Sequence, residues 1–110
     1  MAWTLSQSGT SSQTVGGGEQ TMGSADTNNA SFVLVVDLNA MALGDLVELR
    51  VKTMTLAAGT TRQAWKGTYQ HVQLNPIKIS PPIASDQSLT CTINQPAGTA
   101  RAAVWKLLRI

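Results

Sequence analysis

Residues 45–56 read DLVELRVKTMTL, and this stretch decides the fold class. Two kinds of side chain alternate along it, with Val47, Leu49, Val51 and Thr53 on one side and Glu48, Arg50 and Lys52 on the other. A period of two residues indicates a β-strand with one buried face and one face in water. Such faces are typical of antiparallel sheets, so we predict an antiparallel strand here.

The segment before this stretch also predicts a strand. Residues 31–38 (SFVLVVDL) form a nearly continuous apolar run, which is typical of a central strand buried on both faces. Residues 39–45 predict a tight connection, in which Gly44 is free to adopt a positive φ. A single helical turn is the alternative for this connection.

The second half of the chain continues the β pattern. Its predicted elements are a turn at 57–59, a long strand at 60–73, a short edge strand at 77–80, a strand at 88–94 and a last strand at 99–110. We expect Gly67 to mark a bulge, and Pro76 restricts the segment after it to a sheet edge. A helix is the competing interpretation for residues 100–110, but the two-residue period favours a strand.

Seven or eight short strands with little helix predict an all-β fold. Parallel strands need long crossovers, usually helical, which no segment of this chain supplies, so we expect antiparallel sheets. We therefore predict an antiparallel β-sandwich, jelly-roll-like in architecture, formed by residues 31–110.

Residues 1–30 differ in composition from the rest of the chain. Between Ser6 and Ser31, 20 of 26 residues are Gly, Ser, Thr, Gln or Asn. Such a segment alone buries too little apolar surface to offset the entropy lost when it becomes ordered. We predict an extended N-terminal arm that docks on a neighbouring subunit or on another protein surface. A flexible tail and an edge hairpin are the alternatives.

The charge distribution narrows the choice of partners. The formal net charge is +2, but residues 1–49 hold five acidic and no basic residues, whereas residues 50–110 hold all eight basic residues and one acidic residue. The basic residues are spread singly, whereas surfaces that follow a phosphate backbone concentrate them, so nucleic-acid binding is disfavoured. We expect these charges on solvated strand faces, and pairing between subunits is an alternative.

The sequence also argues against membrane insertion and secretion. No apolar run approaches the ~20 residues of a membrane-spanning helix. The first ten residues, MAWTLSQSGT, lack a basic segment followed by an apolar one, so no secretory signal is expected.

Residues that could support catalysis or metal binding are scarce. His71 is the only histidine and no G-x-S-x-G elbow is present, so we expect no catalytic site. The clustered carboxylates are Asp37, Asp45 and Glu48, of which the first two flank turns. Cys91 is the only cysteine, which excludes an intramolecular disulfide and falls short of a metal site. We expect no cofactor and a buried, inert Cys91 thiol.

Several large or charged residues are candidates for contact with partners. Trp105 is expected in the core, whereas Trp3 and Trp65 are candidate interface anchors. Arg62 and Arg101 are expected to meet acidic groups of a partner. The predicted interface set is Trp3, Leu5, Arg62, Trp65, Tyr69 and Arg101. The alternative is that all three tryptophans belong to the core.

Three segments carry a resemblance to a known class of proteins, namely residues 35–51 (VVDLNAMALGDLVELRV), residues 62–73 and residues 92–107 (TINQPAGTARAAVWKL). The matching positions are Asp37, Leu38, Met41, Gly44, Asp45, Val47, Glu48 and Arg50, followed by Gln95, Ala97, Gly98, Thr99, Arg101 and Trp105. With them, residues 31–110 resemble small structural proteins of tailed bacteriophages. The resemblance implies a non-enzymatic virion protein that decorates the capsid and cements it across subunit seams.

The resemblance also implies partners and a location. The partners are the major capsid protein and further copies of the chain, with a homotrimer favoured and a dimer as the alternative. The implied location is the capsid exterior, after synthesis in the bacterial host cytoplasm. A tail or fibre component remains an alternative function, and so does a β-sandwich module that binds carbohydrate or a host surface.

Overall fold

The computed structural model describes residues 2–54 and 60–110. It contains nine strands: β1 (Thr4–Ser12), β2 (Gln20–Asp26), β3 (Ala30–Asp37), β4 (Leu46–Thr53), β5 (Arg62–Gln70), β6 (Ile77–Ile79), β7 (Ile83–Ser85), β8 (Leu89–Ala97) and β9 (Ala102–Arg109). No helix occurs among the described residues, so the all-β prediction is confirmed. The turn predicted at 57–59 lies outside the described residues.

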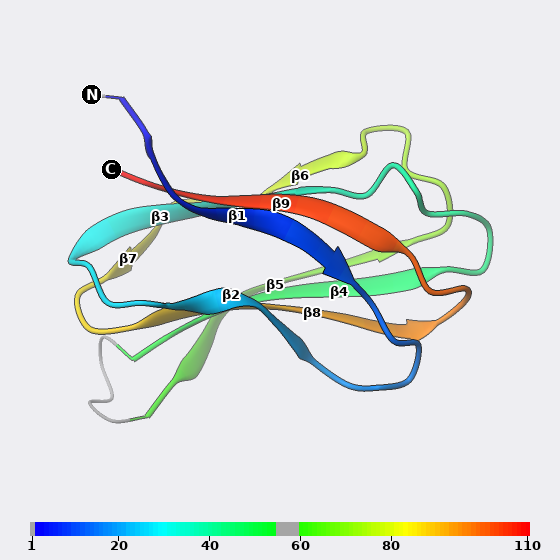
Figure 1. The fold of residues 1–110 in the computed structure, drawn as a ribbon, viewed down its shortest axis with the longest axis horizontal. Helices are drawn as coiled ribbons and strands as arrows, with labels where there is room; N and C mark the ends of the chain where they lie inside the picture. Colours follow the sequence, from blue (N-terminus) through cyan, green and yellow to red (C-terminus); the bar gives the residue numbers. More distant parts are fainter. Residues whose placement is uncertain (1, 55–59) are drawn as a thin grey trace.

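Two antiparallel sheets face each other, with sheet A above sheet B in Figure 1. Sheet A has the order β1-β9-β3-β6, and sheet B has the order β2-β8-β4-β5. The short strands β6 and β7 share the free edge of β3, where β6 pairs with residues 35–37 and β7 with residues 30–32. The predicted antiparallel sandwich is therefore present.

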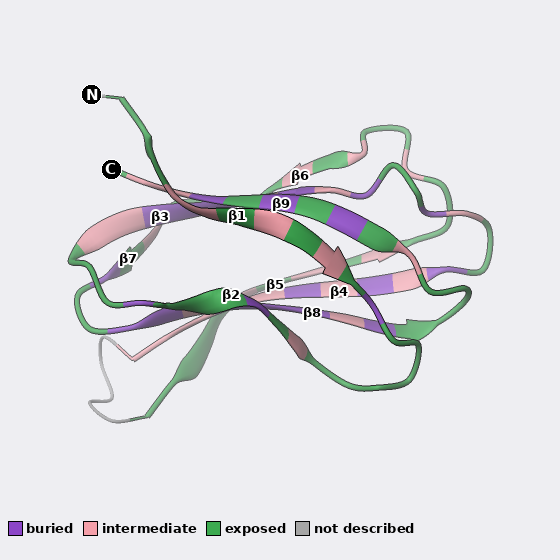
Figure 2. Ribbon diagram, in the orientation of Figure 1, coloured by how far each residue is buried: buried purple, intermediate pink, exposed green. Residues whose placement is uncertain are grey.

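The core lies between the sheets and consists of the inward-facing residues of the longer strands. Sheet A contributes Phe32, Leu34, Val36, Ala103, Trp105 and Leu107, and sheet B contributes Val47, Leu49, Val51, Leu89, Cys91 and Ile93. Figure 2 shows the resulting alternation of buried and exposed residues along β9. The predicted inward positions of Val47, Leu49 and Val51 in β4 and of Leu89, Cys91 and Ile93 in β8 are confirmed, and so is the core position of Trp105.

The N-terminal segment does not form the predicted arm. β1 pairs with β9 from Thr4, opposite Arg109, to Ser12, opposite Ala102. β2 pairs with β8 in the other sheet. Residues 4–12 and 20–26 are therefore edge strands of their own sandwich, and an extended arm over residues 1–30 is not confirmed.

Polar contacts explain why this apolar-poor segment is ordered. The side-chain amide of Gln7 in β1 donates to the carbonyl of Ser24 in β2 (2.8 Å) and its oxygen accepts from the Ser24 N–H (2.9 Å). The Ser6 hydroxyl also contacts the Asp26 carboxylate. Gly9 lies against the ring of Trp105, where a Cβ would come within 3.4 Å. Backbone pairing and these polar contacts order the segment in place of apolar burial. The sequence predicts an arm because the segment has few apolar residues to bury.

The bulge in β5 lies at Ala64 and not at the predicted Gly67, since the register with β4 shifts between Gln63 and Trp65. A Cβ at Gly67 would lie 2.7 Å from the Tyr69 hydroxyl oxygen and 3.0 Å from the ring of Trp65. Glycine is therefore needed at this position because two aromatic side chains on the same face of the strand cover it.

Candidate functional site

Four connections, residues 13–19, 38–45, 71–76 and 98–101, gather at one end of the sandwich, at the right of Figure 1. We call this region the four-loop end. The Gln13 N–H donates to the carbonyl of Arg101 (3.2 Å), and the His71 N–H donates to the carbonyl of Asp45 (2.8 Å). These backbone contacts join the loops in two pairs, residues 13–19 with 98–101 and residues 71–76 with 38–45. Side-chain contacts connect the two pairs.

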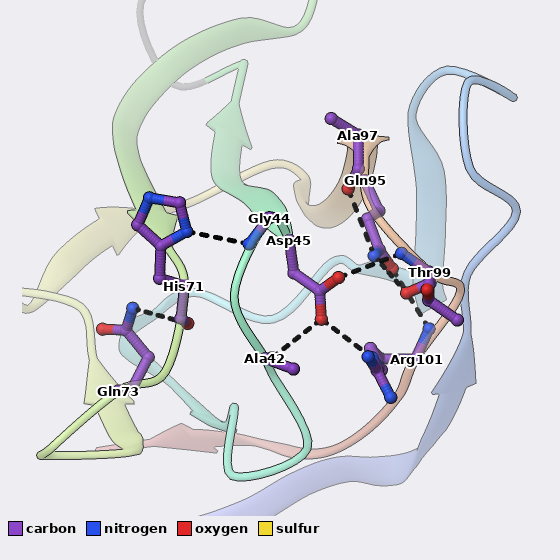
Figure 3. A network of polar contacts seen from close by, with 9 residues as sticks. All are labelled: Ala42, Gly44, Asp45, His71, Gln73, Gln95, Ala97, Thr99 and Arg101. Atoms are coloured by element: carbon purple, nitrogen blue, oxygen red, sulfur yellow. Dashed lines mark hydrogen bonds and ion pairs between the residues drawn. The ribbon is translucent and has the colours of Figure 1, made fainter.

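A buried carboxylate organises the four-loop end (Figure 3). Asp45 is 2% exposed. Its Oδ2 accepts from the Ala42 N–H (2.9 Å) and from Nε of Arg101 (2.8 Å), and its Oδ1 accepts from the Thr99 N–H (2.9 Å). Gly98 makes room for this contact, because a Cβ there would lie 2.2 Å from Oδ1. One side chain thus ties residues 38–45 to residues 98–101.

The electrostatics of Asp45 fit a structural anion. Burial raises the pKa of Asp45, but the hydrogen bonds from the Ala42 and Thr99 N–H groups and the Arg101 guanidinium outweigh it, so that its pKa lies below 3.8. The carboxylate is therefore ionised at neutral pH. Donors occupy both oxygens and the group is buried, so the carboxylate holds the two loops together.

The buried amide of Gln95 supports the same loops. Gln95 is 0% exposed. Its Nε2 donates to the carbonyl of Thr99 (2.6 Å), and its Oε1 accepts from the Arg101 N–H (3.1 Å). Asp45 and Gln95 therefore satisfy the backbone of residues 98–101 from two sides.

His71 belongs to the loop scaffold as well. It adopts a positive φ of 62°, and its Nδ1 accepts from the Gly44 N–H (2.9 Å). Gly44 has the predicted positive φ, at 91°. No group of three or more His, Cys, Asp or Glu side chains in residues 2–54 and 60–110 is placed to hold a metal ion.

Cys91 lies in the core between the sheets and is 2% exposed, as predicted. Burial raises the pKa of its thiol to about 12. The thiolate is the nucleophilic form of cysteine, so this side chain is chemically inert in the folded chain.

The four-loop end carries exposed apolar side chains. Leu43, Val72 and Leu74 are 84%, 63% and 95% exposed. We call these three residues the loop tip. They lie on loops that the Gly44–His71 hydrogen bond joins. Exposed apolar groups can mark interaction sites, so the loop tip is a candidate contact surface.

The outer face of sheet A is also apolar. Its large apolar residues are Leu5 in β1, Val33 and Val35 in β3, Ile77 and Ile79 in β6, and Val104 and Leu108 in β9. We call this set the apolar face. Four of its members are more than half exposed: Leu5, Ile77, Ile79 and Val104. A shallow depression lies between Val35, Ile77 and Val104, beside Asp37 and Lys106.

The outer face of sheet B is ionic instead. Glu48 in β4 contacts Nζ of Lys66 (2.7 Å) and Arg50 (3.4 Å), and Arg50 reaches Glu19 (2.9 Å), which Lys52 also contacts. The hydrogen bond from Lys66 is the main reason that the pKa of Glu48 lies below 4.5. The acidic first part of the chain thus pairs with the basic second part within one molecule.

The structure does not bring the six predicted interface residues together. Trp3 and Leu5, 42% and 51% exposed, lie at the start of the β1 edge, and Arg62 is exposed at the start of β5. Arg101, expected to meet an acidic group of a partner, is ion-paired with Asp45 of its own chain.

Trp65 and Tyr69 are the two members of this set that lie side by side. They project inward from the β5 edge and pack against the core while remaining partly exposed. The ammonium group of Lys78 in β6 lies 4.9 Å from the centroid of the Tyr69 ring. This contact shows that β5 and β6 form one side of the sandwich, opposite the side where Gln7 joins β1 and β2.

The sequence-based set missed the loop tip and most of the apolar face. Leu43 within the predicted connection and Leu74 between two predicted strands were an available signal, since connecting segments run over the protein surface. For Val104, the alternation that places Trp105 inward also places its neighbour outward.

Comparisons with family models, curated proteins and solved structures found no match to this chain. In residues 2–54 and 60–110 no helix has the length and apolar character required to cross a membrane.

Proposed function

We propose that this chain is a non-enzymatic structural protein of a tailed-phage virion, an oligomer that decorates the capsid exterior and cements it across subunit seams. The observation that carries the proposal is the presence of two separate exposed apolar surfaces, the loop tip and the apolar face, on one rigid sandwich. A protein that bridges neighbours needs at least two docking surfaces, and exposed apolar patches mark such surfaces.

The strand order supports the finer proposal of a jelly roll. β1, β2, β3 and β4 alternate between sheets A and B, and the first and last strands lie side by side in sheet A. Viral capsid and lectin domains use double-sheet jelly rolls. A fold does not fix a function, so the surfaces have to carry the functional argument.

In this proposal the loop tip docks on the major capsid protein. The Asp45 and Gln95 contacts hold the loops beneath it in place, which lowers the entropy lost on binding. Several copies joined to each other raise the strength of attachment beyond that of one copy. The sequence predicts docking through residues 1–30, but β1 and β2 belong to the sandwich. We therefore assign docking to the loop tip.

The test is binding of the tagged chain to purified capsids of the phage that encodes it, stripped of the protein and analysed by sedimentation. The wild-type chain is expected to co-sediment, and the double variant Leu43→Ser/Leu74→Ser to bind at least tenfold more weakly. Ile110→Ser, which removes a partly exposed apolar side chain at the other end of the sandwich, serves as the matched control. Absence of wild-type binding, or equal binding by the double variant, would contradict the proposal. Electron microscopy of labelled virions separates a capsid position from a tail or fibre position.

A carbohydrate-binding module is the second candidate, favoured by the adjacent, partly exposed rings of Trp65 and Tyr69 at the β5 edge. Aromatic faces of this kind stack on sugars. A glycan array distinguishes the two functions: the virion proposal expects no signal, whereas binding that Trp65→Ala abolishes would favour the carbohydrate module.

A further inference from the structure

We propose that the apolar face of sheet A is a two-fold interface between two copies of this chain. This dimer gives the oligomer of the proposed function a surface and a symmetry, but it does not rest on the capsid role, because self-association is tested on the chain alone. A two-fold dimer differs from the trimer that the resemblance to phage proteins favours.

Two charged residues, Asp37 and Lys106, lie in the middle of the apolar face. In the β3–β9 register Lys106 lies opposite Val35, and Asp37 lies opposite Val104. The base and the acid therefore occupy diagonal positions, and the two valines occupy the other diagonal. Neither charge takes part in an ion pair within the described chain. Asp37 accepts a hydrogen bond from the Asn39 N–H (3.0 Å) in its own turn.

This pattern is self-complementary. A two-fold axis that lies in the plane of the face and bisects the diagonal between Lys106 and Asp37 places Lys106 over the partner's Asp37. By symmetry it also places Asp37 over the partner's Lys106, so one rotation forms both ion pairs. The same rotation carries the β6 side of the face, with Ile77, towards Leu108 of the partner subunit.

A second copy is therefore the occupant that fits best. A face with one unpaired acid and one unpaired base among apolar side chains excludes partners that leave either charge buried alone, because an unpaired buried charge is costly. A copy of the same face supplies both opposite charges in the required places. The loop tip lies at the end of the sandwich and not on this face, so a dimer leaves it accessible.

The test uses reciprocal charge reversals and light scattering coupled to size exclusion. The wild-type chain, 11.6 kDa as a monomer, is expected to elute at twice that mass. Lys106→Glu and Asp37→Lys are each expected to be monomeric, because each places like charges opposite one another twice. An equimolar mixture of the two variants is expected to form a dimer, since both contacts then join opposite charges. Thermal unfolding followed by circular dichroism checks that each variant is folded.

Asp86→Lys is the matched control, because it reverses an exposed charge between β7 and β8 and leaves the apolar face unchanged. It is expected to remain dimeric. A wild-type chain that stays monomeric up to about 1 mM, where binding energies fall to about 4 kcal/mol, would overturn the inference. A trimer would overturn it too, because a three-fold axis does not pair one face with itself. Dimers that survive both reversals, or variants that fail to associate on mixing, also count against it.

Discussion

Among the described residues, the hydrogen-bond partners of the Asp45 carboxylate are all donors, namely two backbone N–H groups and the Nε of Arg101. A carboxylate is therefore the one side chain of this size that satisfies every partner, since both of its oxygens accept. Sequence reasoning marks Asp45 as a residue beside a turn. It does not reveal the partners, because Thr99 and Arg101 come from a loop more than fifty positions away and only the antiparallel arrangement of β4 and β8 brings that loop near.

Asp45→Asn tests this role. The amide nitrogen of the new side chain meets donors and finds no acceptor, so we expect the free energy of unfolding to fall by about 3 kcal/mol. Asp86→Asn is the control, because Asp86 is exposed, and its effect is expected within about 0.5 kcal/mol. Urea unfolding followed by tryptophan fluorescence measures both. Equal changes in the free energy of unfolding for the two substitutions would contradict a structural role for Asp45.

The pH dependence of stability follows from three carboxyl groups. Burial raises the pKa of Asp26, but hydrogen bonds from Ser6 and Asn28 bring it below 3.8, and the pKa values of Asp45 and Glu48 are also lowered. A group whose pKa is lower in the folded chain stabilises the fold fully above its unfolded pKa, and this stabilisation is lost as the pH falls through the folded pKa.

We therefore expect these groups to leave stability unchanged between about pH 7 and pH 5 and to make it fall steeply below about pH 4. Urea midpoints at a series of pH values give the profile. The Asp45→Asn chain is expected to lose less stability on acidification than the wild type, because one of the three titrating groups is gone. Parallel profiles for the two chains would show that Asp45 does not contribute.

At the scale of the elements, alternation located the strands well where a strand has one clearly buried face. The sequence predicts β4 and β8 correctly, because buried residues such as Val47, Leu49, Cys91 and Ile93 occupy every second position. β1 lacks this signal, since its inward positions hold residues such as Gln7 and Gly9. β1 becomes ordered by pairing with β9, which lies at the other end of the sequence. Local composition therefore predicts an arm where the fold has a strand.

Truncation separates a strand from an arm. Removal of residues 2–12 exposes the edge of β9 and one side of Trp105, so we expect the cooperative thermal transition to move to much lower temperature or to disappear. A chain that lacks only residues 2 and 3, which precede β1, is expected to unfold at the wild-type temperature. Circular dichroism measures both. An unchanged thermal transition after removal of residues 2–12 would support the predicted arm and contradict the strand.

At the scale of the molecule, the sandwich separates an ionic sheet face from an apolar one. The sequence contains both patterns, since Glu48, Arg50 and Lys52 alternate with core residues and Val104 alternates with Trp105. The sequence does not show which strands are neighbours. β6 lies beside β3 and not beside β5, and this pairing places the two isoleucines of β6 on the apolar face. The sequence alone can predict a surface that lies on a single strand, but it cannot predict a surface that several strands form together.

The same strand order predicts slow folding. β1 pairs with β9 and β2 pairs with β8, so most of both sheets forms only after distant parts of the chain meet. All-β chains of this kind refold in milliseconds to seconds. Stopped-flow dilution from urea, followed through tryptophan fluorescence, is expected to show a phase in this range. Complete refolding within microseconds would contradict the strand order.

The first and last strands begin and end together, with Thr4 opposite Arg109. Both chain ends therefore emerge at the end of the sandwich away from the four-loop end, at the left of Figure 1. A peptide or domain fused to either end projects away from the loop tip and leaves it free. If the loop tip faces a capsid, such fusions point outward into solvent. The chain is then a natural carrier for displaying foreign sequences, and a short linker between its ends would give a circular permutant with the same sheets.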